Sequence, residues 1–460
     1  MTAKQRPQSS PGDRELRLWR VGRALTVTFI AAVLVSAGVF YGLVYLLDVQ
    51  EIDSTAKLDA KTLFDLVKLS FGVVAGAGAL VALVVAYRRQ RVDEAGAHRE
   101  ATRLHTERFT QAVEQLGSDS PAVRLGGVHA LAGLADDAPD TSLRQTCIDV
   151  LCAYLQLPYT PDPGTDPAHQ EEHHHYLALR KVRHTILRLI GDHYRRPQGT
   201  HRSWQGHDLD LTGVTIDGTM DFHDAVFSGG RLLFSSAVFS GGKVFFNSAE
   251  FSGADVSFDN AEFSGAHVSL DHAEFSGGNV SFFEAEFSGG NVSFFDAEFS
   301  GCSVSFDHAT FSGARVYFNE ATFSGDRVGF DHATFSAGGM SFDYAVFSGG
   351  FVSLDNTVFS GARVGFNEAT FSGCSVGFGH ATFSAGIVGF SEATFSGGMV
   401  AFGQARFSAG VVGFDQATFP GGLVAFIGAT GPAPDGLLSA FPTSVYMSAL
   451  LPAAWRIPNP

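Results

Sequence analysis

Cysteine is scarce in this sequence, and the few cysteines are not arranged as metal ligands. The 460 residues include four cysteines and no CxxC pair, which excludes the Cys/His spacing of a structural zinc site. Cys302 and Cys374 take a repeat position that is mostly Gly or Ala, whereas Cys147 and Cys152 lie five residues apart in an apolar helical segment. We therefore expect buried, reduced thiols, as in a cytoplasmic protein.

Positive charge is also scarce. Asp and Glu number 47 against 31 Lys and Arg, and the formal net charge is -16. Between Asp221 and Thr430 there are 21 acidic and six basic residues, and 17 of the 21 acidic residues precede Tyr344. Such a surface repels phosphate, which argues against direct binding to nucleic acid. No Gly-rich phosphate loop follows a strand, because the many glycines belong to the corners of a repeat.

A 12-residue repeat fills the second half of the chain. One Phe recurs every 12 residues from Phe227 to Phe419, and a second Phe follows it by seven residues. Apolar residues alternate with polar ones inside each unit, as in Val280-Ser-Phe282, which is typical of short strands. Gly, Asp, Asn and Ser between these strands favour turns. Self-similarity at a fixed short period predicts a solenoid, here a parallel β-helix.

The volume of the repeat indicates how many residues close one coil. A 12-residue coil would have to enclose two Phe, one Val and one Ala, which is more than a close-packed interior of that size allows. A coil of two units, roughly 24 residues, gives four sides and room for four rings. We predict roughly eight coils about 4.8 Å apart, in a rod about 40 Å long. The predicted core ladder consists of Phe251, Phe263, Phe275, Phe287, Phe299, Phe311, Phe323 and Phe335.

The pattern of a small residue two positions before a bulky one, as in Ala309-Thr-Phe311-Ser-Gly, resembles the pentapeptide-repeat family. In that family A-x-[LF]-x-x units stack as a right-handed quadrilateral β-helix. The resemblance therefore implies a right-handed parallel β-helix for residues 204–430. The phasing departs from the family, because multiples of five do not give a period of 12. Residues 431–460 are expected to form a C-terminal cap or a disordered tail.

Residues 88–200 are predicted to form a small helical spacer domain, because their apolar residues recur at helical spacing. The run Arg108-Phe-Thr, followed by Val123-Arg-Leu-Gly-Gly-Val, looks like one HEAT-type helical pair. It also resembles the segment between membrane hairpin and repeats in bacterial membrane-anchored pentapeptide-repeat proteins. That family has no established catalytic residues to transfer, so the resemblance implies a protein that is not an enzyme and has no cofactor.

Two apolar stretches precede the helical spacer. Their lengths predict transmembrane helices at residues 19–47 and 63–87, joined by a short external loop at 48–62 and preceded by a tail at 1–18. Arginines lie before the first stretch and after the second, whereas acidic residues dominate the loop. The positive-inside rule then predicts a two-pass plasma-membrane protein with both termini in the cytoplasm and two helices in the lipid bilayer.

Glutamates at one position of the repeat form the candidate interaction surface. They are Glu250, Glu262, Glu274, Glu286 and Glu298. On a coil of two units these five split between two opposite faces as ladders of like charge, which destabilise the sheet somewhat. Two interpretations stay open. The glutamates form a solvated surface that keeps the rod soluble, or they imitate nucleic acid, as in the pentapeptide-repeat proteins that bind DNA gyrase.

Three other patterns are weaker candidates for chemistry. Asp-His pairs such as Asp271-His272 recur, but a Ser-His-Asp site is recognised by geometry, and we expect these pairs at exposed corners. The run His169-Gln-Glu-Glu-His-His-His is dense in metal-binding groups, yet adjacent histidines cannot all face one ion from a regular helix. A broken Thr ladder that begins at Thr310 is typical of ice-binding solenoids, which a cytoplasmic location disfavours.

The patterns together predict a non-catalytic scaffold. A membrane-tethered cytoplasmic β-solenoid would present protein-binding faces on a rod that stacked Phe residues make stiff. The alternative is an acidic DNA mimic that binds or protects a topoisomerase or gyrase. The identity of the protein partner and the oligomeric state stay open, and direct contact with nucleic acid is not expected.

Overall fold

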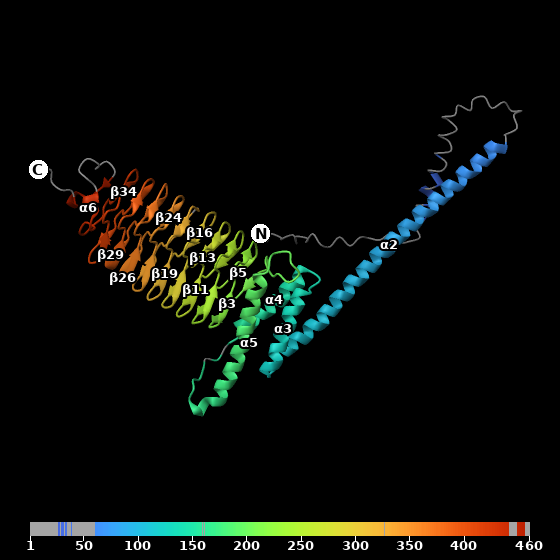
Figure 1. The fold of residues 1–460 in the computed structure, drawn as a ribbon, viewed down its shortest axis with the longest axis horizontal. Helices are drawn as coiled ribbons and strands as arrows, with labels where there is room; N and C mark the ends of the chain where they lie inside the picture. Colours follow the sequence, from blue (N-terminus) through green and yellow to red (C-terminus); the bar gives the residue numbers. More distant parts are fainter. Residues whose placement is uncertain are drawn as a thin grey trace, which may run out of the picture. The chain divides into compact units, whose positions relative to one another are not determined.

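The computed structural model describes residues 60–440 except 159, 161 and 326, residues 449–455, and eight scattered residues between Thr26 and Gly38. The chain forms two compact units, Met1–Arg103 and Leu104–Pro460. Helices come first along the chain and the strands follow, as Figure 1 shows.

The helices before the solenoid are α2 (Ala60–Leu116), α3 (Pro121–Asp136), α4 (Thr141–Gln156) and α5 (Gln170–Tyr194), with a short 3₁₀ turn η2 (Pro167–His169) before α5. A four-residue helix α6 (Leu437–Ala440) and a 3₁₀ turn η4 (Ala453–Trp455) lie near the C-terminal end of the described part. Local sequence sets their starts. Pro lies in the first turn of α3, where its missing N–H costs no hydrogen bond. The helical region is therefore confirmed, whereas its likeness to a HEAT pair stays a prediction.

The prediction of transmembrane helices is wrong. Among the residues that the structure describes, no helix is long and apolar enough to cross a membrane. The stretch 63–87 lies inside the 57-residue helix α2, where the apolar run Leu69–Ala86 gives way to Arg88 and Arg89. A helical run of that length rises about 27 Å, short of the roughly 30 Å hydrocarbon core. The other expected span, 19–47, falls almost entirely outside the described residues.

The second half of the chain is a β-solenoid of about nine turns, each made of four short strands. All strand pairs of the described part are parallel, and partners lie two repeat units apart throughout the repeat, as Phe263 does from Phe287. The coil of two units is thus confirmed, whereas the right-handed sense implied by the resemblance stays a prediction. We number the four faces of the solenoid 1 to 4 in the order in which each coil builds them.

Face 1 contains β1 (Leu209–Asp210), β5 (Arg231–Leu233), β9 (Asp255–Ser257), β13 (Asn279–Ser281), β17 (Ser303–Ser305), β21 (Arg327–Gly329), β25 (Phe351–Ser353), β28 (Ser375–Gly377), β31 (Met399–Ala401), β34 (Leu423–Ala425) and β35 (Ala449–Leu450). Face 2 contains β2 (Thr215–Ile216), β6 (Val238–Phe239), β10 (Glu262–Phe263), β14 (Glu286–Phe287), β18 (Thr310–Phe311), β22 (Thr334–Phe335), the start of β26 (Val358–Gly365), the start of β29 (Thr382–Gly389) and β32 (Arg406–Phe407). Face 3 contains β3 (Thr219–Asp221), β7 (Lys243–Phe245), β11 (His267–Ser269), β15 (Asn291–Ser293), β19 (Arg315–Tyr317), β23 (Gly339–Ser341), the ends of β26 and β29, and β33 (Val411–Gly413). Face 4 contains β4 (Val226–Phe227), β8 (Glu250–Phe251), β12 (Glu274–Phe275), β16 (Glu298–Phe299), β20 (Thr322–Phe323), β24 (Val346–Phe347), β27 (Thr370–Phe371) and β30 (Thr394–Phe395).

Four columns of aromatic rings fill the solenoid. All eight Phe of the predicted ladder are buried, and each one stacks on the Phe one coil away. The ring centroids of Phe263 and Phe287 lie 4.7 Å apart with an interplanar angle of 2°. Rings from different columns meet edge to face, as Phe306 and Phe318 do at 5.8 Å and 88°. Both arrangements suit the ring quadrupoles, so the core gains specific aromatic contacts beyond the burial of apolar surface.

One turn in each repeat unit, the turn after the second Phe, places a non-glycine residue in the left-handed conformation. Seventeen described residues, one in each repeat unit from Asp224 to Gln416, have φ between 53° and 64°. At Glu284 the turn is closed by the N–H of Ala285, which donates to the carbonyl of Phe282 at 3.1 Å. Left-handed backbone costs an L-residue about 1–2 kcal/mol, so the stacked coils must hold each of these corners in place.

Side chains from both flanks cover the ends of the solenoid. At the helical end α5 packs against β3, and the ring of Tyr194 stacks on Phe227 at 5.6 Å. At the other end the indole of Trp455 meets the Phe426 ring edge to face at 5.3 Å, and its Nε1–H donates to the carbonyl of Gly431 at 2.9 Å. Both terminal coils are therefore shielded, as solenoids require.

Candidate functional site

The five candidate glutamates lie on two faces. Glu250, Glu274 and Glu298 are in register on face 4, one per coil, whereas Glu262 and Glu286 are in register on face 2. None of the five carboxylates makes a hydrogen bond or an ion pair with any residue that the structure describes. They form two short acidic columns with a step of about 4.8 Å, not one continuous patch.

The part of the solenoid beyond these columns has a different surface. Of the acidic residues counted above, only four follow Tyr344 in the repeat. Large apolar side chains are more numerous there: Ile387 and Val411 are exposed on face 3, Phe351 and Met399 on face 1, and Ile427 in a turn, whereas the acidic part exposes Phe283 and Phe295. Ile387 and Val411 lie on adjacent coils, and neighbouring exposed apolar residues in a stable protein are typical of an interaction surface. The rod is thus acidic toward the helices and nearly neutral with apolar groups toward the C-terminal end.

A groove runs along face 3 across the ends of β19, β23, β26, β29 and β33 and extends into this neutral part. Its volume is about 640 Å³. The floor follows the third strand position, where Gly365, Gly389 and Gly413 replace the side chains that Phe245 and Tyr317 supply in other coils. These glycines supply no side chain of their own at three successive coils. At Gly365 and Gly389 the Oδ1 atoms of Asp343 and Asn367 lie 2.6 Å and 2.8 Å from the place of a Cβ, whereas nothing lies within 4 Å at Gly413, so the hollow is deepest there.

The two walls of the groove differ in charge. The first strand position supplies Arg315 and Arg363 toward one end and Ile387 and Val411 toward the other. Neither guanidinium makes a hydrogen bond or ion pair with a described residue. The far wall carries Asp343, Asn367, Ser391 and Asp415.

Acidic side chains at the corners mainly bind the backbone. The Oδ1 atom of Asp343 accepts the N–H of Asn367 one coil later at 2.8 Å, and Asp271 accepts that of Phe295 at 3.1 Å. His272, the sequence neighbour of Asp271, instead places Nδ1 3.2 Å from Asp296. Asp and His that are adjacent in sequence therefore have different partners, and they do not form the Ser-His-Asp arrangement of a hydrolase.

The His-rich segment does not assemble a metal site. His173 Nδ1 lies 2.6 Å from an Asp162 oxygen and His169 Nδ1 lies 2.8 Å from Glu172, so the ring nitrogens are used in separate pairs. Within the residues that the structure describes, no group of three or more His, Cys, Asp or Glu could hold a metal ion.

All four cysteines are buried, and the Sγ atom of Cys147 lies 3.9 Å from Nε2 of the buried His105. Burial raises the pKa of the Cys147 and Cys152 thiols to about 12 and that of Cys374 to about 11. A thiol must be deprotonated to act as a nucleophile, so these groups lack the environment of a reactive cysteine.

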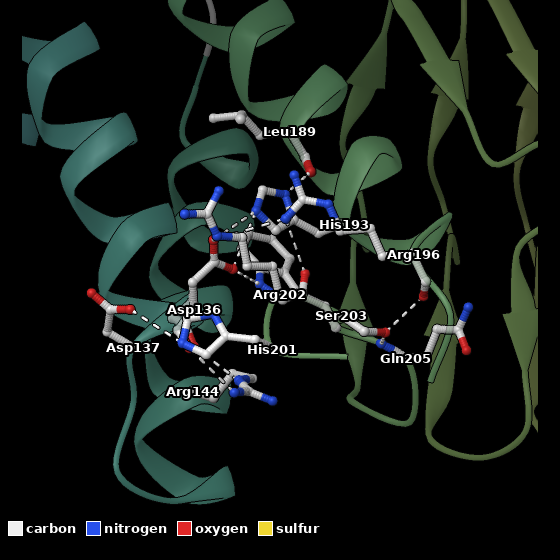
Figure 2. A network of polar contacts seen from close by, with 12 residues as sticks. Asp136, Asp137, Arg144, Leu189, His193, Arg196, His201, Arg202, Ser203 and Gln205 are labelled. Atoms are coloured by element: carbon white, nitrogen blue, oxygen red, sulfur yellow. Dashed lines mark hydrogen bonds and ion pairs between the residues drawn. The ribbon is translucent and has the colours of Figure 1, made fainter. Parts of the chain in front are cut away.

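A polar network joins the helices to the start of the solenoid, as Figure 2 shows. The Asp136 carboxylate, at the end of α3, accepts from Trp204 Nε1 at 3.2 Å and lies 3.2 Å from His193 Nε2. Arg196 and Arg202 approach the same carboxylate at 3.9 Å and 3.8 Å. The partners of Asp136 come from α5 and from the segment that leads into the first coil, so we assign the network to the docking of the helices on that coil.

Sequence reasoning located the glutamate columns but missed the groove. The clue was present, because the Val-Ser-Phe units of the earlier coils become Val-Gly-Phe at Gly365, Gly389 and Gly413. The repeat predicts every glycine at a corner, yet these three lie inside strands.

Comparisons with protein-family models, with characterised proteins and with solved structures gave no significant match to this chain. The fold itself is consistent with a pentapeptide-repeat-like solenoid, through its stacked parallel coils and regular Phe spacing. Arguments about function therefore rest on the surface of the solenoid.

Proposed function

We propose that the solenoid is a non-catalytic protein-interaction scaffold whose binding surface lies on its neutral, C-terminal part. The observation that carries this proposal is the concentration of exposed apolar side chains there, among them Ile387 at 41% and Val411 at 47% exposure, beside the groove on face 3. Exposed apolar side chains are unfavourable in water, and binding to a partner protein would bury them and so lower the free energy.

The core supports the same proposal. Four stacked Phe columns and backbone hydrogen bonds between successive coils make a surface that changes little on binding, so a partner would lose less ordering entropy. Polar corner groups such as Asp271 and Asp343 are engaged by the backbone, which suits a structural role better than catalysis.

Site-specific photo-crosslinking in the cells that express this protein tests the proposal. A photoreactive amino acid would replace Ile387 or Val411 in the full chain, with Glu274 as the matched exposed position in the acidic part. We expect one protein to crosslink from the first two positions and not from Glu274, and we expect that protein, once purified, to bind the purified chain. Equal crosslinking from all three positions, or none, would contradict a scaffold with its binding surface in this region.

The acidic columns favour a second candidate function. Glu250, Glu274 and Glu298 stand in register on face 4, without partners among the described residues. A row of carboxylates at regular spacing could imitate a phosphate backbone and bind a topoisomerase. DNA supercoiling by purified gyrase, measured with increasing amounts of the full chain, tests this. Inhibition that disappears in Glu274→Gln and at high salt would favour mimicry over the scaffold.

A further inference from the structure

We infer that the groove on face 3 binds an extended peptide that carries a carboxylate and a large apolar side chain four residues apart. The inference rests on the proposed scaffold function and names the chemistry of its partner. It stands on the shape of the groove, on the two arginines without partners, and on the position of the apolar side chains relative to them.

The cationic end of the groove provides a site for one carboxylate. Arg315 and Arg363 occupy the same register position two coils apart, and Gly339 lies between them with no side chain. Their backbone positions are about 9.6 Å apart, and the two arginines therefore flank an open position at Gly339. In a solenoid that is otherwise strongly acidic, two arginines without a partner are unusual, and guanidinium groups bind carboxylates with matched geometry.

The apolar end of the groove provides a site for one large side chain. Ile387 and Val411 are register partners on adjacent coils, and both are exposed on the wall above Gly389 and Gly413. Asp343 lies on the far wall in the coil of Gly339, where two guanidinium groups outweigh its one carboxylate, whereas Asp415 beside Val411 shares its end of the groove with no arginine. The groove therefore has a net positive end and a net negative end, and a carboxylate is favoured only at the first.

The distance between the two ends sets the spacing in the peptide. From Gly339 to the midpoint of Ile387 and Val411 is two and a half coils, about 12 Å at the strand spacing. Four residues of an extended chain span about 13 Å, and side chains four apart point to the same side. A spacing of two residues would fall short of the second site by about 5 Å, and a spacing of six would pass it by about 8 Å.

The width of the groove favours an extended chain over a helix. Along Gly365, Gly389 and Gly413 the hollow is one side-chain column wide, because the first strand position keeps Arg363, Ile387 and Val411 and the far wall keeps Asn367, Ser391 and Asp415. A helix with its side chains is about 10–12 Å across and cannot enter such a trough. From Tyr317 to Gly413 there are four coil steps, about 19 Å, which accommodates roughly six extended residues.

Fluorescence anisotropy with synthetic probes tests the inference on the purified full chain. The probes are fluorescein-labelled Ser/Thr decapeptides with one Leu and one Glu separated by two, four or six positions, in both chain directions. We expect the probe with a spacing of four to bind at least about tenfold more tightly than the others in one direction. We also expect replacement of its Glu by Gln to weaken binding about tenfold, since exposed ion pairs are worth modest factors.

We choose substitutions whose new residue already occurs at the same register position of another coil, so that the variants are expected to fold. Arg315→Asn with Arg363→Asn introduces the residue that Asn291 already supplies at this register position, and Lys243→Asn, on the same face outside the groove, is the matched control. The double variant should weaken the probe about tenfold and the control should leave it unchanged. Circular dichroism and the melting temperature should match the parent chain in all of them.

A second variant blocks the floor. A Cβ added at Gly413 meets no atom within 4 Å, and Tyr317 shows that this register position tolerates a large ring. Gly413→Tyr should therefore fold normally and abolish binding of the spacing-four probe.

The outcomes separate this inference from the proposed function. Binding that is independent of spacing, or unaffected by Gly413→Tyr and by loss of both arginines, would overturn the peptide inference. So would the absence of binding by every probe up to about 1 mM, the weakest range of measurable affinity. Crosslinking of one partner from Ile387 and Val411 would still support the scaffold in that case, whereas failure of both experiments would remove both proposals.

Discussion

Truncation of one ring in the middle of a Phe column should destabilise the solenoid strongly. Phe311 is 3% exposed, and its ring stacks between Phe287 and Phe335 with centroid distances of 4.7 Å on both sides. Phe311→Ala removes the ring from both contacts and leaves a cavity that the rigid neighbouring coils cannot close. The expected loss is about 4 kcal/mol, within the usual range for buried Phe, and two lost aromatic pairs contribute about 1 kcal/mol each.

A conservative change in a neighbouring column supplies the control. Phe306 belongs to a column in which the chain already uses Leu354, two coils away and fully buried. Phe306→Leu conserves most of the volume, so it should cost less than about 1.5 kcal/mol.

Urea unfolding followed by circular dichroism measures both variants, and hydrogen exchange shows where the structure opens. Exchange is needed because long repeat arrays can unfold in parts and depart from two-state behaviour. In Phe311→Ala we expect faster exchange in the coils directly above and below the substitution. A loss below about 1 kcal/mol, or equal effects of the two variants, would refute the view that stacked rings hold the coils together.

Three further predictions concern a left-handed turn residue, the contact between α5 and the first coil, and the buried thiols. Glu392, with φ of 59°, should gain stability as Glu392→Gly and lose it as Glu392→Val, which thermal melting of both variants would show. Burial would raise the pKa of Asp217, but hydrogen bonds from His184 and Arg180 lower it to about 2, below the ordinary 3.8, so its stabilising effect should be complete above about pH 4 and vanish as the pH falls toward 2. Asp217→Asn should cost on the order of 2 kcal/mol at pH 7 and flatten this part of the acid-unfolding curve. Thiol titration with a disulfide reagent at pH 8 should leave Cys147 and Cys152 unreacted until denaturant is added, since burial raises their pKa to about 12.

The coil could be predicted from the sequence because its determinants recur locally. The spacing of Phe fixes which residues face inward, and the volume of the repeat decides between one and two repeat units per coil. The register of Phe263 on Phe287 confirms the larger coil. Because every repeat unit shows the same spacing of Phe, a substitution in one unit does not change the coil that the other units predict.

The end caps could not be predicted in the same way, because they depend on contacts between segments that share no pattern. Nothing in the sequence around Tyr194 indicates that its ring continues a column that begins at Phe227. The docking of α5 requires Gly191, where a Cβ would lie 2.4 Å from the carbonyl oxygen of Asp221. Such a close approach is visible only in three dimensions.

The expected transmembrane helices show the limit of hydropathy as a criterion. Leu69–Ala86 is apolar throughout, yet it is one part of a helix that continues with polar side chains to Leu116. The length of the apolar part, not its composition, decides whether a helix can span the hydrocarbon core.

The groove was missed because it arises from what several coils lack at one register position. A glycine in one unit means little alone, whereas three aligned glycines remove a row of side chains from a face. Recognising this required the register, which places Gly365, Gly389 and Gly413 beside one another although two repeat units of sequence separate each from the next.

A coil of two repeats also constrains how the length of this rod can change. Insertion or deletion of two repeat units adds or removes one complete turn and keeps every later side chain on its original face. A change of a single unit is half a turn, so it would move everything beyond it to the opposite side of the rod and bring the later groove residues from face 3 to face 1. Duplication within such a gene therefore has two classes of outcome. An even number of added repeat units lengthens the rod, whereas an odd number also moves the later residues to the opposite face.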